Sequence, residues 1–247
     1  MISSLQSLAQ GYRAAVFGVS GGVGGALTRA LCADPRCARV YAGARRPEHD
    51  LTSPKMTPFA FDLEEEASIA EAAASISQDG PVHLVIVATG ILHEGAVQPE
   101  KTWRTLRPEA LAHVFAINVI GPAIIAKHML TCLSKTEKAV FAALSARIGS
   151  ISDNRLGGWH AYRASKAALN MLLRSFAIEL DRTNPLAVCV ALHPGTVDTP
   201  LSAPFQTGVG NLLTPAASAQ KLLTVIDGLT PAQSGRLFGW DGAEILP

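Results

Sequence analysis

The chain is poor in charge, and the charge that it has is balanced. Asp, Glu, Lys and Arg make up only 17% of its 247 residues, and the formal net charge is +1. The sequence has no long basic run and no patch of interleaved basic and aromatic residues. Nucleic acids and anionic membrane surfaces attract proteins through concentrations of positive charge, so neither is expected as a partner.

Cysteine and long apolar runs are also scarce. The four cysteines include no CxxC pair, and no nearby histidine completes a zinc-binding set. Reduced thiols and no bound metal are therefore expected. No segment reaches the roughly 20 uninterrupted apolar residues of a transmembrane helix, because polar residues and a proline interrupt the apolar stretch 111–133. Residues 1–12 lack the apolar core of a signal peptide, so a cytoplasmic protein is expected.

Short apolar runs alternate with helical patterns along the whole chain. This alternation predicts a single doubly wound (Rossmann) α/β domain over residues 1–247, with a mainly parallel seven-stranded sheet and helices on both faces. Residues 1–12 would form an N-terminal extension. The expected strands lie at 14–17, 39–43, 58–61, 83–87, 138–144, 186–192 and 236–240, and the expected helices at 23–33, 65–77, 109–133, 160–181 and 215–227.

A glycine-rich turn follows the first expected strand. Gly18, Gly22 and Gly24 stand in a Gly-x3-Gly-x-Gly pattern just before a helix. Phosphate binding needs close approach to the backbone, free N–H groups and the positive end of a helix dipole. The pattern alone also fits a tight turn with close helix packing. Its position in the first strand–helix unit favours a dinucleotide site.

The second expected strand ends in Ala44, Arg45 and Arg46. In this fold an acidic residue at that position binds the free 2′-hydroxyl of the adenosine ribose, whereas an arginine accommodates a 2′-phosphate. Because the position holds no acid, NADP(H) is favoured over NAD(H). The alternative interpretation is a solvated pair of basic residues in a loop.

Tyr162 and Lys166 stand four residues apart near the start of the helix expected at 160–181, so they share one helix face. A phenol has a reference pKa of about 10, and a nearby ammonium lowers the pKa of the phenol. Such a tyrosine exchanges a proton with a carbonyl or alcohol oxygen. The same spacing also occurs by chance in an ordinary exposed pair, so it gains weight only beside the other motifs.

These motifs together resemble the classical short-chain dehydrogenase/reductase family over essentially the full chain, and within it the carbonyl-reductase (sniffer and C-factor-like) subgroup. Asp62-Leu63, Asn118, the loop 145–154 and the segment 194–199 match further family motifs. The resemblance implies that Asn118 holds a water in the proton relay. It implies cofactor contacts at Gly18, Ser20, Gly22, Val23, Gly24, Arg45, Asp62, Leu63, Ala88, Thr89, Gly90, Tyr162, Lys166, Pro194, Gly195, Val197 and Thr199.

The sequence departs from the family pattern at two places. Val87 to Gly90 replaces Asn-Asn-Ala-Gly, with Gly90 kept. Ser145-Ala146 replaces a pair of serines, the second of which binds the substrate oxygen in the family. Ser145 is expected to take that role. The alternatives are Ser150 or a site without the hydroxyl.

The predicted function is NADP(H)-dependent transfer of a hydride to or from a carbonyl or alcohol carbon of a small, apolar molecule. Tyr162 would be the acid/base, Lys166 would lower its pKa, and Ser145 would polarise the substrate oxygen. The stretch 200–213 would be a substrate lid, bordered by 91–97 and Trp159. The lid lacks Arg and Lys, which argues against a large anionic substrate; its apolar residues are Leu201, Phe205, Leu212 and Leu213.

Two further expectations concern the class of protein and its assembly. The competing class is a non-catalytic NAD(P)-binding module with a signalling or redox-sensing role on the same fold. The long helices 109–133 and 160–181 make a homodimer or homotetramer plausible.

Overall fold

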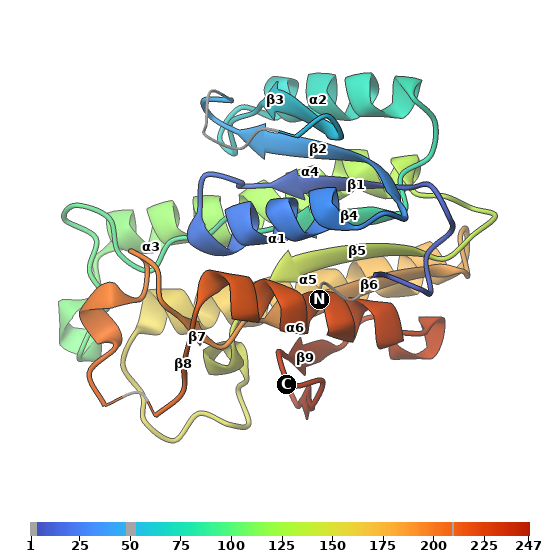
Figure 1. The fold of residues 1–247 in the computed structure, drawn as a ribbon. Coiled ribbons are helices and arrows are strands. Elements are labelled where there is room, and N and C mark those ends of the chain that lie inside the picture. The colour runs from blue at the N-terminus through green and yellow to red at the C-terminus, as the bar shows by residue number, and fades with distance from the viewer. Residues whose placement is uncertain (1–3, 48–52, 209) are drawn as a thin grey trace.

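A computed structural model describes residues 4–47, 53–208 and 210–247 (Figure 1). Residues 1–3 of the expected N-terminal extension and residue 209 of the expected lid lie outside this part. Eight strands form one sheet in the order β10-β9-β6-β5-β4-β1-β2-β3. They are β1 (Tyr12–Phe17), β2 (Cys37–Ala44), β3 (Met56–Ala60), β4 (Leu84–Val87), β5 (Ala139–Leu144), β6 (Ala187–His193), β9 (Leu237–Gly239) and β10 (Glu244–Ile245).

The doubly wound α/β fold is confirmed, with one strand more than expected. All neighbours in the sheet are parallel except β9 and β10, which are antiparallel. The additional strand, β10, has two residues and is too short to leave an alternating pattern in the sequence. Outside this sheet, β7 (Thr196–Val197) and β8 (Leu212–Leu213) form a small parallel pair.

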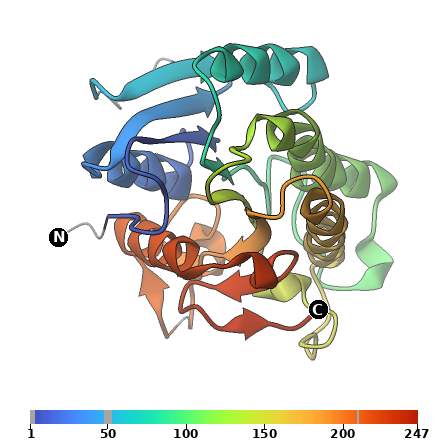
Figure 2. The same cartoon turned by 90° about the vertical axis from the view of Figure 1, so that its right-hand side faces the viewer.

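Helices cover both faces of the sheet (Figures 1 and 2). Strands buried on both faces are apolar throughout, which explains the unbroken apolar runs of β4 and β5. One face carries α1 (Gly22–Ala33) and α6 (Pro215–Gly228), and the other carries α2 (Glu66–Gln78), α3 (Pro108–Phe115), α4 (Gly121–Met129) and α5 (His160–Asp181). Short 3-10 turns lie at Trp103–Thr105, Leu130–Cys132, Arg147–Gly149, Ala203–Phe205 and Pro231–Gln233.

The long helix expected at 109–133 is interrupted by a π-helical turn at Ala116–Ile120, which separates α3 from α4. By length and composition alone, Pro108–Cys132 is the one helical stretch of the described chain that passes the test for a membrane span. Ile125 and Met129 of this stretch pack fully buried in the core against the sheet. Less than half of the window that passes the test is buried, so these two side chains mark the face of the helix that packs on the sheet.

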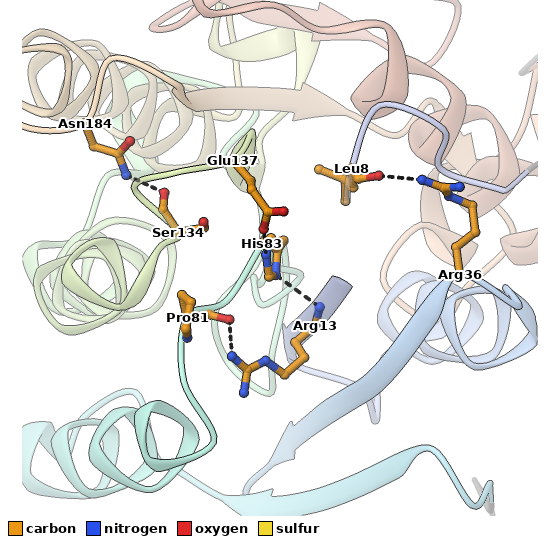
Figure 3. Close-up of polar contacts among 8 residues, drawn as sticks. All are labelled: Leu8, Arg13, Arg36, Pro81, His83, Ser134, Glu137 and Asn184. Atoms are coloured by element: carbon orange, nitrogen blue, oxygen red, sulfur yellow. Dashed lines mark hydrogen bonds and ion pairs between the residues drawn. The ribbon is translucent and has the colours of Figure 1, made fainter. Parts of the chain in front are cut away.

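Polar contacts close the amino ends of the strands (Figure 3). The backbone N–H of Arg13 donates to Nδ1 of His83 at 3.3 Å, so the proton of the neutral ring lies on Nε2, 2.8 Å from a carboxylate oxygen of Glu137. Asn184 donates to the Ser134 carbonyl at 2.8 Å. Side chains of the chain itself therefore occupy this edge. The opposite edge, at the carboxyl ends of the strands, is where doubly wound sheets bind ligands.

Candidate active site

The glycine-rich turn joins β1 to α1 and leaves the helix N-terminus open. Gly18 has φ +96°, a left-handed conformation that favours glycine. Gly21 caps α1, and no side chain of the described residues accepts from the first turn. The free N–H groups and the helix dipole make this turn a site for an anion.

Two of the glycines are required by close packing. A methyl group built on Gly22 would lie 2.6 Å from Cγ2 of Thr199, and one built on Gly24 would clash with the carbonyl oxygen of Gly18. Gly24 is buried and does not line the cleft. Gly24 therefore makes a packing contact within the turn, and its contact with the cofactor stays a prediction.

A cleft crosses the carboxyl ends of the strands where the strand order reverses, between β1 and β4. Its walls bring together residues from five parts of the chain. Those that were predicted from the sequence are Gly18, Ser20, Arg45, Asp62, Leu63, Ala88, Thr89 and Gly90.

A second cavity continues this cleft toward α5. Ser20, Ala88, Thr89 and Gly90 line both spaces. The continuation adds six further predicted residues, namely Gly22, Val23, Tyr162, Lys166, Pro194 and Thr199. Gly195 and Val197 line a third cavity, which also adjoins Tyr162. The predicted cofactor residues thus form one continuous surface, with Gly24 behind it.

Two observations show that this surface fits an extended polar ligand such as a dinucleotide. The glycine turn leaves backbone N–H groups open where side chains have no room. The hydroxyl oxygen of Thr89 is buried in the cleft and has no hydrogen-bond partner within the described part of the chain. Buried hydroxyl groups are nearly always hydrogen-bonded, so this one indicates a ligand atom or water beside it.

Tyr162 and Lys166 lie on the first turns of α5, at the junction of the cofactor cleft and the third cavity. Nζ of Lys166 lies 5.7 Å from the centre of the Tyr162 ring and donates to the Leu144 carbonyl at 2.9 Å. Burial raises the pKa of Tyr162 to about 12 and lowers the pKa of Lys166 to about 8. The Tyr162 shift is opposite to the one expected from the spacing, and its cause is burial of the phenol.

Asn118 lies in the π-helical turn and is fully buried. Its carboxamide accepts from the Ile91 N–H at 2.8 Å and donates to the Ile91 carbonyl at 2.9 Å and to Ser165 Oγ at 3.1 Å. Asn118 thereby joins the segment after β4 to α5, directly behind Gly90. The hydrogen bonds of this carboxamide are therefore made to groups of the chain itself. The role of Asn118 in holding a water stays a prediction.

Ser145 follows β5 and lines both cavities next to Tyr162. Its hydroxyl donates to Oδ1 of Asn170 at 2.6 Å. Asn170 was missed from the sequence, although it stands one further turn along the face of α5 that carries Tyr162 and Lys166. The alternative serine, Ser150, accepts from the Asp153 N–H within the loop and is not among the residues that line either cavity.

The third cavity has a volume of about 430 Å³ and lies under the expected lid. Leu201 and Phe205 line it as predicted, whereas Leu212 and Leu213 form β8 and only anchor the end of the lid. The Phe205 ring packs on Trp159, with ring centres 4.9 Å apart. Trp159 has φ +51°, an uncommon conformation for a bulky residue, and it holds the wall opposite the lid.

The four basic residues of this cavity were not given a role from the sequence: Arg147, Arg155, Arg163 and His193. His193 ends β6, and burial, with a smaller effect of Arg147, lowers its pKa to about 4. Its Nδ1 is buried without a partner among the described residues. A signal for His193 was present, since it directly precedes the expected Pro194 segment.

Comparison with known proteins places the chain in a family. A family model described as short chain dehydrogenase matches residues 13–209, so the chain belongs to the short-chain dehydrogenase/reductase family. It is an NAD(P)-dependent oxidoreductase of that family. The resemblance drawn from the sequence motifs is confirmed.

Two relatives and two solved structures show the extent of the likeness. C-signal of Myxococcus xanthus is 40% identical over 135 residues, 55% of this chain and 77% of that protein. The 1-hydroxy-2-glutathionyl-2-methyl-3-butene dehydrogenase of Rhodococcus sp. is 31% identical over 181 residues, 73% of this chain and 76% of that protein. NADPH-bound carbonyl reductase from chicken fatty liver is 26% identical, with a TM-score of 0.81 over 97% of this chain and 100% of that chain. Carbonyl reductase Sniffer of Drosophila melanogaster shares the fold, with a TM-score of 0.83 at 23% identity over 96% of this chain and 100% of that one.

Proposed function

We propose that the protein is an NADP(H)-dependent carbonyl reductase whose proton donor is Tyr162. The observation that carries the proposal is the position of Tyr162, which lines both the cavity that continues the cofactor cleft and the cavity under the lid. A proton donor is needed at that junction, because the reacting carbonyl of a substrate must lie against the nicotinamide end of the cofactor. A bound nicotinamide dinucleotide would supply the hydride.

The protonation states of the two α5 residues favour reduction. With its pKa raised to about 12, Tyr162 keeps its proton at neutral pH and can donate it to a carbonyl oxygen. With its pKa lowered to about 8, Lys166 is mostly an ammonium at neutral pH. Its positive charge then stabilises the phenolate that remains after the proton has left. A hydrogen bond to the Leu144 carbonyl holds Lys166 in place.

Arg45 supports the preference for NADP(H). It directly follows β2 and lines the cofactor cleft, where its guanidinium would bind a 2′-phosphate. The neighbouring Arg46 does not line the cleft. The chicken carbonyl reductase that shares the fold was solved with NADPH bound.

The cavity under the lid supports a small substrate with an apolar part. Leu92, Trp159, Leu201 and Phe205 contribute apolar surface close to Tyr162. The lid is closed onto the segment after β4, since the His93 ring lies 3.2 Å from the Leu201 carbonyl oxygen and 5.6 Å from the centre of the Phe205 ring.

The test is NADPH oxidation with a panel of aldehydes and ketones. We expect the Tyr162→Phe variant to lose at least about a hundredfold in kcat, because general acid catalysis contributes that much, and to keep its affinity for NADPH. Tyr41→Phe is the matched control, since the Tyr41 hydroxyl bonds to Asp79, away from the three cavities. Turnover by Tyr162→Phe at the rate of the control would refute the assignment of Tyr162. NADPH binding without turnover of any substrate would refute the reductase.

A further inference from the structure

The cavity under the lid carries a concentration of positive charge that the proposed reaction does not need. Arg147, Arg155 and Arg163 all line it, and Asp153 is the only carboxylate among its described lining residues. The whole chain, by contrast, has a formal net charge of only +1. Charge is therefore gathered in this cavity.

The cofactor does not account for these arginines. None of the three lines the cofactor cleft or its continuation toward α5, where Arg45 and Lys166 are the cations. Binding of the dinucleotide therefore leaves the arginine wall free to face another anion.

The fold does not account for them fully either. Arg147 faces Asp153 at 3.8 Å, and both side chains are about half exposed, so that pair adds little stability. Arg155 is exposed and has no ion pair within the described part of the chain. Arg163 is partly buried and donates to the carbonyl oxygens of Gly158 and Ile148 at 3.0 and 3.4 Å. These two bonds fix its orientation. Asp153 is the carboxylate that acts on its charge, so the same carboxylate faces both Arg147 and Arg163.

The three arginines come from one part of the cavity lining. They lie in the loop between β5 and α5 and in the first turn of α5, a segment that also contributes Ile148 and Leu156, whereas Leu92, Leu201 and Phe205 come from the segment after β4 and from the lid. In Figure 1 that loop (yellow) and the lid (orange) both lie at the left, where the strands end. The lid lacks Arg and Lys, but other residues of the cavity lining supply three arginines, so the lid alone does not describe the charge of the cavity.

We propose that the preferred substrates are carbonyl compounds that carry a carboxylate at a distance from the reacting carbon. The inference rests on the reductase function proposed above. The apolar body would lie against the lid, the carbonyl at Tyr162 and the carboxylate on the arginine wall. Guanidinium groups bind carboxylates through paired N–H donors.

The test compares 4-formylbenzoate with its methyl ester, which has the same aldehyde and no charge. We expect kcat/KM with NADPH to be about tenfold higher for the acid, equal to about 1.4 kcal/mol of charge-assisted binding. Arg155→Gln should remove most of this preference by lowering kcat/KM for the acid toward the value for the ester. Arg163→Lys keeps the charge but not the planar fork, and should reduce the preference in part. Arg174→Gln, on the exposed side of α5, is the control and should keep it.

The possible outcomes separate the two proposals. Equal kcat/KM for acid and ester, unaltered by Arg155→Gln, would overturn the carboxylate inference and leave the reductase intact. Added salt screens ion pairs. If salt removed the preference for the acid in the wild type and had no such effect in Arg155→Gln, the result would support the carboxylate inference. Failure to reduce either aldehyde while NADPH binds would refute the reductase and the inference with it.

Discussion

The Ser145 hydroxyl donates a hydrogen bond to Oδ1 of Asn170, 2.6 Å away. A hydroxyl that polarises a carbonyl must instead donate its hydrogen bond to the substrate oxygen. We therefore expect Ser145→Ala to lower kcat by less than about tenfold, well short of the 10²- to 10³-fold loss typical when an oxyanion donor is removed. Steady-state kinetics of the aldehyde reduction measures this. A loss of a hundredfold or more would restore Ser145 as the polarising residue.

The neighbouring Ala146 gives the complementary prediction. Its methyl group lines the cavity beside Tyr162, at the position where the family places its second serine. We expect Ala146→Ser to raise kcat, because it adds a hydroxyl on the cavity wall without removing the bond between Ser145 and Asn170. Ala146→Val is the control for added bulk without a donor. Slower turnover by the serine variant than by the valine variant would contradict the prediction.

Local sequence patterns were enough to predict the fold, because continuous apolar runs such as Leu84 to Val87 are typical of strands buried on both faces. The break in the helix 109–133 was not predictable in this way. It occurs at Asn118, whose partner Ile91 lies 27 residues away. Asn170 could have been predicted, because it stands four residues after Lys166 and therefore lies on the same face of α5.

The arginine wall of the substrate cavity was also beyond local patterns. Arg155 reaches the cavity through a loop that turns at Gly157, Gly158 and Trp159, all with positive φ. Nothing in the residue types of that loop fixes its path. The charge of the cavity therefore depends on tertiary placement.

Lys166 should give the reaction a basic limb in its pH dependence. Burial lowers its pKa to about 8, so Lys166 loses its charge as the pH rises through that value. Tyr162 keeps its proton over the same range, since its pKa is about 12. We expect kcat/KM for carbonyl reduction, which reports the free enzyme, to fall above pH about 8. In Lys166→Arg, kcat/KM should be lower overall but should not fall above pH about 8, because a guanidinium stays charged. An unchanged basic limb in that variant would assign it to another group, and Lys127→Arg, on the exposed surface, is the control.

His193 should make the fold less stable in mild acid. Its pKa is about 4 in the folded chain, mainly because of burial, against a reference value of 6.5. Between these two values the unfolded chain binds a proton that the folded chain does not, so stability falls as the pH drops from about 6.5 and levels off below about 4. The loss reaches at most about 3.5 kcal/mol, at about 1.4 kcal/mol for each pKa unit. Urea unfolding at pH 7 and pH 5 measures it, and His193→Gln should flatten the difference. Equal differences in the two proteins would show that His193 does not titrate as described.

Arg45 and Arg46 provide a matched pair for cofactor choice. The two side chains are adjacent and both exposed, but only Arg45 lines the cofactor cleft. Arg45→Asp replaces a donor to a 2′-phosphate with a carboxylate that repels it and that suits a free 2′-hydroxyl. We expect the Kd for NADPH to rise about 10- to 100-fold, since a hydrogen bond to a charged group contributes about 1.5–3 kcal/mol, and NADH to bind at least as well as before. Arg46→Asp makes the same change of charge outside the cleft and should weaken NADPH much less. Titration of the two reduced cofactors by fluorescence measures all four affinities. If both variants weakened NADPH equally, the effect would be one of general charge, and the assignment of Arg45 to the 2′-phosphate would be wrong.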